Sequence, residues 1–64
     1  MTTAELTDLA SQAREHAGNI RRDILNAQTR LEHIRLTGLA VEAEQLANRL
    51  EATVSIYQNQ ENND

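Results

Sequence analysis

This 64-residue sequence has no cysteine, proline, phenylalanine or tryptophan, and it has a single tyrosine. The lack of cysteine excludes disulfides and thiolate sites and is compatible with a reducing cytoplasm. Since proline and most aromatic residues are missing, any core must consist of Leu, Ile, Val and Ala, a composition typical of long helices. No stretch approaches the roughly 18 apolar residues of a membrane span, and no basic-then-apolar segment resembles a secretory signal. We therefore expect a cytoplasmic, all-α protein without membrane contact.

Residues that could carry catalysis are scarce. His16 and His33 have no His, Asp or Glu three or four residues away, which is the spacing that a metal site on a helix needs. Glu42 and Glu44 are two residues apart and point to different sides of a helix, so they do not form an acid and base pair. The sequence has no grouping of Ser, His and Asp and no glycine-rich phosphate loop. We expect no enzymatic activity, no cofactor and no metal.

A regular apolar stripe organises the first half of the chain. Its spacings alternate between four and three residues, as in a heptad repeat, and its members are Leu6, Ala10, Ala13, Ala17, Ile20, Ile24, Ala27, Leu31 and Ile34. Such spacing places all of them on one face of a helix, which must be buried against another helix. Thr2 and Glu5 have the spacing of a capping box. The sequence predicts a first helix over about 3–37.

The apolar pattern restarts out of phase after Gly38. A C-terminal glycine is well suited to ending a helix, so we expect a turn at 37–38, a second helix over about 39–58 and a disordered tail at 59–64. The stripe of this second helix is Leu39, Ala43, Leu46, Leu50 and Tyr57, widened by Ala40, Ala47 and Val54. The residues expected to pack between the helices are Ile20, Ile24, Leu31, Ile34, Leu39, Leu46, Leu50 and Tyr57. The alternative is one continuous helix with a four-residue stutter in a coiled coil.

An antiparallel hairpin with these bounds has a long first helix and a shorter second one. The second helix would then cover the first only as far as about Ala17, and the apolar residues beyond it would need another surface. We expect Leu6, Leu9, Ala10 and Ala13 to bind a partner, with Ile56 as a secondary contact. Association also fits the small size of the chain, because so short a chain buries too little surface for a large stability margin.

Three arginines, Arg14, Arg21 and Arg35, flank the apolar stripe at intervals of seven and fourteen residues. They could follow the phosphates of a nucleic acid, or pair with glutamates of a neighbouring helix. The second interpretation is favoured, because the net charge of −4 arises entirely from Gly38 onward and no aromatic residue in the first helix could stack on a base. We therefore expect no nucleic-acid binding.

The chain also resembles the small E-component co-chaperones of the type III secretion needle, which are cytoplasmic helical hairpins. The likeness rests on Met1-Thr2-Thr3, Leu6, Asp8-Leu9, Arg14-Glu15, Ile20, Ala27, Leu31-Glu32, Leu50-Glu51-Ala52 and Ile56-Tyr57. The resemblance implies that the chain binds a helical-repeat, tetratricopeptide-like chaperone, and that the pair keeps a needle subunit soluble and unpolymerised. Two other functions stay open: a homodimeric four-helix bundle that binds RNA, and a small hairpin that inhibits another protein.

Overall fold

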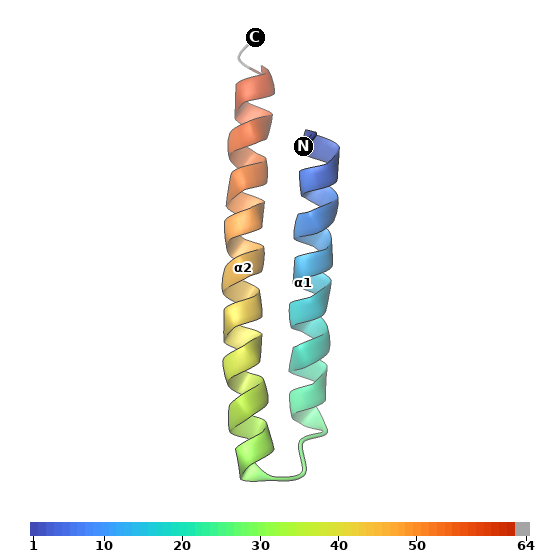
Figure 1. Ribbon diagram of the computed structural model, residues 1–64, viewed down its shortest axis with the longest axis vertical. Helices are drawn as coiled ribbons and strands as arrows, with labels where there is room; N and C mark the ends of the chain where they lie inside the picture. Colours follow the sequence, from blue (N-terminus) through green and yellow to red (C-terminus); the bar gives the residue numbers. More distant parts are fainter. Residues whose placement is uncertain (63–64) are drawn as a thin grey trace.

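The chain folds into two antiparallel helices joined by a short loop (Figure 1). The computed structural model describes residues 1–62, in which α1 spans Thr3–Leu25 and α2 spans Arg30–Asn62. The hairpin is elongated, with extents of 53 × 15 × 14 Å. This arrangement confirms the predicted all-α hairpin and rules out one continuous helix.

The start of α1 is set by the predicted capping box. The Oγ1 atom of Thr2 accepts a hydrogen bond from the Glu5 backbone N–H at 3.1 Å, and the Glu5 carboxylate accepts one from the Thr2 N–H at 3.3 Å. Both backbone donors would otherwise lack a partner at the end of the helix. The first helix therefore begins where the sequence predicts, at Thr3.

The turn lies at residues 26–29, so the prediction of a turn at 37–38 is wrong. The chain leaves α1 through hydrogen bonds from Asn26 and Ala27 to carbonyls three residues earlier. A second cap then starts α2: Thr29 Oγ1 accepts from the Glu32 N–H at 3.1 Å, and Glu32 accepts from the Gln28 N–H at 2.9 Å. Thr29 and Glu32 have the same spacing as Thr2 and Glu5, and this local signal decides where the second helix begins.

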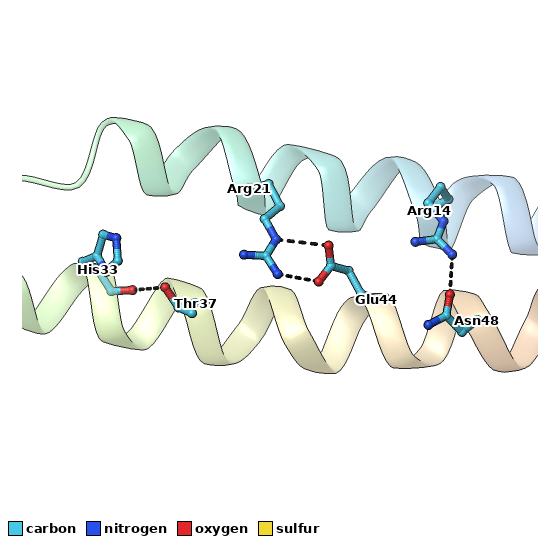
Figure 2. Close-up of polar contacts among 6 residues, drawn as sticks. All are labelled: Arg14, Arg21, His33, Thr37, Glu44 and Asn48. Carbon is cyan, nitrogen blue, oxygen red and sulfur yellow. Dashed lines mark hydrogen bonds and ion pairs between the residues drawn. The ribbon is translucent and has the colours of Figure 1, made fainter.

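Gly38 lies inside α2 rather than at its start, and its φ is not positive. The helix continues through this region, and the Thr37 hydroxyl donates a hydrogen bond to the His33 carbonyl one turn earlier at 2.7 Å (Figure 2). An exposed glycine lowers helix stability by about 1 kcal/mol relative to alanine, which is not enough to break a helix packed along its length. The predicted end of the first helix at about 37 and the predicted start of the second at about 39 are therefore wrong.

The relative lengths of the helices are also the reverse of the prediction. α1 has 23 residues and α2 has 33, and α2 extends past the N-terminus of α1 (Figure 1). The expected disordered tail is helical over residues 59–62, and residues 63 and 64 of that tail lie outside the described part of the chain. The first helix thus has no uncovered end for a partner to bind.

The helices pack through two small-residue stripes. On α1 the stripe is the predicted one as far as Ile24, and its most buried members are Leu6, Ala10 and Ala17. On α2 the buried residues are Ala40, Ala47 and Val54, which belong to an unbroken repeat of four and three residues: Leu36, Ala40, Ala43, Ala47, Leu50, Val54 and Tyr57. Facing alanines let the two backbones come close. We call these two facing stripes the seam.

Candidate functional site

One side of the seam is closed by ion pairs between the helices. Arg14 donates to both carboxylate oxygens of Glu51, at 2.6 and 3.2 Å, and to the Asn48 side-chain oxygen at 2.6 Å. Arg21 forms the same two-pronged contact with Glu44, at 2.6 and 3.0 Å (Figure 2). We call this side the ion-pair flank. Its contacts confirm, for Arg14 and Arg21, that the arginines pair with glutamates of the neighbouring helix.

The arginines shift the titration of their partners. Hydrogen bonding from Arg14 lowers the pKa of the Glu51 carboxyl, and hydrogen bonding from Arg21 lowers the pKa of the Glu44 carboxyl. These pairs are about half exposed, so they stabilise the fold little. Their main effect is to set the register, because a slip of one residue would break every two-pronged contact at once.

Arg35 differs from the other two arginines of the predicted stripe. It lies on α2, together with the glutamates, because the turn precedes it. The seven-residue spacing therefore predicts pairing with the other helix only for arginines that lie on the same helix. The interpretation of Arg35 as a member of the same interhelical row is wrong.

The opposite side of the seam exposes large apolar side chains. On α2, Leu39 and Leu46 each come one residue before an alanine of the seam, whereas Glu44 comes one residue after one. Residues just before and just after a stripe lie on opposite sides of it, so the two leucines lie on the side away from the ion pairs. On α1, Leu9 precedes Ala10 in the same way. These side chains remain substantially exposed: Leu9 by 41%, Leu39 by 50%, Leu46 by 54% and Tyr57 by 40%.

We call this surface the apolar flank and define it by Leu9, Ile20, Leu39, Leu46, Leu50 and Tyr57, of which Ile20 and Leu50 are half-buried at the edge of the seam. It draws on both helices and runs from near the turn to the open end of the hairpin. A shorter exposed row on the ion-pair side of α2, Ile34 and Val41, lies near the turn only. A continuous apolar row on the surface of a small protein is typical of an interface.

His16 interrupts the apolar flank on α1. It lies seven residues after Leu9, hence on the same line of the helix, and it is exposed. No group of three or more His, Cys, Asp or Glu that could hold a metal is found among residues 1–62. His16 is thus a polar side chain in an apolar row.

The expected partner-binding residues divide into buried and exposed ones. Leu6 and Ala10 are buried inside the hairpin, where they form a cluster with Val54 against which Leu50 packs. The expectation that they project beyond the second helix is wrong, since α2 covers them. Ala13 is half-buried and belongs to the seam, whereas Leu9 is exposed on the apolar flank.

Ile56 is exposed as expected, but it lies on the side of α2 away from the seam. It is therefore not part of the apolar flank.

The residues expected to pack between the helices divide in the same way. Ile20, Ile24 and Leu50 are half-buried along the seam. The prediction that Leu31 and Ile34 pack between the helices is wrong, because they lie on α2 and not at the end of α1, and they are exposed by 68% and 57%. Leu39 and Leu46 belong to the apolar flank instead of the helix interface, and Tyr57, at the end of the α2 stripe, is exposed by 40% at the edge between the two. Gly38, the expected turn residue, is an exposed residue of α2.

Within the described residues, no helix has the length and apolar character needed to cross a membrane. Neither a protein-family model, nor a curated protein, nor a solved structure matches this chain.

Proposed function

We propose that this chain is a small non-enzymatic adaptor that binds helices of other protein chains through its apolar flank. The observation that carries the proposal is the contrast between the two sides of the seam. One side satisfies its charged side chains within the hairpin, whereas the other leaves Leu39 and Leu46 exposed seven residues apart, with Tyr57 exposed beyond them. Seven-residue spacing is what a partner helix needs in order to pack along the whole row.

The resemblance to needle co-chaperones gives this function a specific form. The partner would be a cytoplasmic, helical-repeat chaperone of the tetratricopeptide type, and the complex would keep a type III needle subunit from polymerising. Helical repeats stack into extended concave surfaces lined by helices, and an elongated hairpin with one apolar side has the shape to lie in such a surface. On this proposal, the binding residues shift from the end of α1 to the apolar flank, with Leu9 common to both.

An RNA-binding function is the weaker alternative. Arg14 and Arg21 each hold a glutamate across the helix interface, so contact with phosphates would require breaking those pairs. The net charge of −4 also repels a polyanion. A hairpin that inhibits another protein would use the same apolar flank and differs only in the identity of the partner.

The test is co-purification with a needle chaperone and its subunit, with two matched variants. Leu39→Glu with Leu46→Glu places two charges on the apolar flank. Ile34→Glu with Val41→Glu places the same charges at the same spacing on the other side of α2. We expect Leu39→Glu with Leu46→Glu to lower the affinity for the chaperone at least about 100-fold, since each buried leucine contributes roughly 1.5–3 kcal/mol. The second pair should leave binding unchanged.

Equal binding by the two double variants would contradict a role for the apolar flank. A wild-type chain that binds neither the chaperone nor the chaperone–subunit complex would reject the needle co-chaperone form of the proposal. Saturable RNA binding that falls steeply with salt and is lost in Arg14→Glu with Arg21→Glu would favour the alternative instead.

A further inference from the structure

The isolated hairpin leaves more surface exposed than a compact protein of its mass. It exposes 4977 Å², whereas the scaling of surface with mass gives about 4,100 Å² for a compact 7.2-kDa chain. Among the residues whose burial the structure describes, the side chains with almost no exposure are Ala17, Ala40 and Ala47, which are small. The interior thus contributes little apolar burial, and most of the large apolar side chains lie outside it.

We infer that the apolar flank binds a second copy of this chain, so that two hairpins form a four-helix bundle. This inference goes beyond the proposed function, because a second copy on the apolar flank has to dissociate before a partner chaperone can bind there. A compact protein of twice the mass would expose about 6,800 Å², roughly 3,100 Å² less than two separate hairpins. Because a side-by-side pair of 53 Å hairpins is less compact than such a protein, about 3,100 Å² is the upper limit of the buried area, and specific interfaces bury about 1,200–2,000 Å² or more.

The distribution of side chains along the flank orients the two copies. The flank of α2 carries four of the six apolar residues, Leu39, Leu46, Leu50 and Tyr57, whereas α1 contributes only Leu9 and Ile20. If α1 of one copy faced α1 of the other, His16 would lie against the partner copy's α1 flank, where the apolar residues are only Leu9 and Ile20. Placing α1 of one copy against α2 of the other gives every flank residue of α1 a leucine or tyrosine to contact.

In this arrangement the two copies are related by a two-fold axis parallel to the hairpin, and every neighbouring pair of helices is antiparallel. The interface is then self-complementary, as a two-fold dimer requires. The ion-pair flanks face outward on both copies, where their charges remain solvated. His16 of one copy lies near Leu46 and Leu50 of the other, so it is a polar side chain among apolar ones in the middle of the interface row.

The decisive measurement is sedimentation equilibrium of the purified full chain. We expect a mass twice that of the 7.2-kDa chain and a thermal midpoint that rises with protein concentration, since dissociation accompanies unfolding. Leu39→Glu with Leu46→Glu should raise the dissociation constant at least about 100-fold, whereas Ile34→Glu with Val41→Glu should leave it unchanged. A folded, monomeric wild-type chain would overturn the inference.

Because the flank variant could also lose its fold, a variant with the opposite effect completes the test. His16→Leu replaces the polar side chain of the row and should lower the dissociation constant about tenfold without changing the stoichiometry. An unchanged or raised constant would overturn the proposed orientation of the copies. The test also separates this inference from the proposed function: a monomer that binds the chaperone through the flank refutes only the dimer. A dimer whose flank variants still bind the chaperone refutes only the adaptor role.

Discussion

The seam and the apolar flank are both built from apolar residues at heptad spacing. In most proteins the large apolar side chains are buried, and here the distribution of side-chain size is reversed. The seam buries mainly alanine, while the flank exposes leucine and tyrosine. Small residues bring the helices close, so a leucine is fully buried between them only at the open end, at Leu6, among the described residues. On the proposed function, the residues with most apolar surface lie where another chain would cover them.

The sharpest way to test this comparison is to shorten one leucine in each region. Leu6→Ala removes a buried side chain from the cluster with Ala10 and Val54 and should lower the free energy of unfolding by about 2–5 kcal/mol. Leu9→Ala removes an exposed one and should cost less than about 0.5 kcal/mol in the monomer. Chemical denaturation at low concentration measures both. Equal losses would mean that the two regions do not differ as described.

A methyl group added outside both regions should stabilise the protein. Gly38 lies in the interior of α2, and a Cβ atom built there meets no neighbouring atom within 4 Å. Gly38→Ala should therefore raise the free energy of unfolding by about 1 kcal/mol through helix propensity alone. If Gly38 formed a turn instead, the same change would destabilise the chain, so thermal unfolding of this variant also checks the position of the loop.

The smallest expected effect concerns the ion-pair flank. The pKa values of Glu44 and Glu51 are lowered in the folded chain, so the contribution of these pairs is fully present above the ordinary glutamate pKa. It is lost as the pH falls through the lowered values. Thermal midpoints of the wild type and of Glu44→Gln with Glu51→Gln should differ slightly at pH 7 and coincide at about pH 2. A difference that grows toward acid would contradict this sign.

Much of the fold could be predicted from local signals. The capping box at Thr2 and Glu5 and the stripe from Leu6 to Ile24 follow directly from residue type and spacing. The predicted turn at 37–38 is wrong because it rests on Gly38 and takes no account of the second Thr-x-x-Glu signal, at Thr29 and Glu32. A glycine permits a turn but does not require one, whereas a cap supplies hydrogen bonds that only a helix start can use.

The face of α2 that packs on α1 could not be predicted from the apolar pattern of α2 alone. Two apolar stripes overlap there and share Ala43, Leu50 and Tyr57. One continues through Leu39 and Leu46, the other through Ala40 and Ala47. Leucine has more apolar surface, so periodicity favours the first. The helices pack through the second because the α1 stripe also consists largely of alanine, and fit between two surfaces is a property that single-helix patterns do not contain.

The cluster of Leu6, Ala10 and Val54 lies at the open end of the hairpin, farthest along the chain from the loop. One end of the molecule is thus held covalently and the other by its bulkiest buried side chains. As a result, the alanine-lined middle of either helix cannot separate from its neighbour unless this distal contact opens first. Amide protons there should exchange with solvent only when the whole hairpin unfolds, rather than by progressive fraying from the termini.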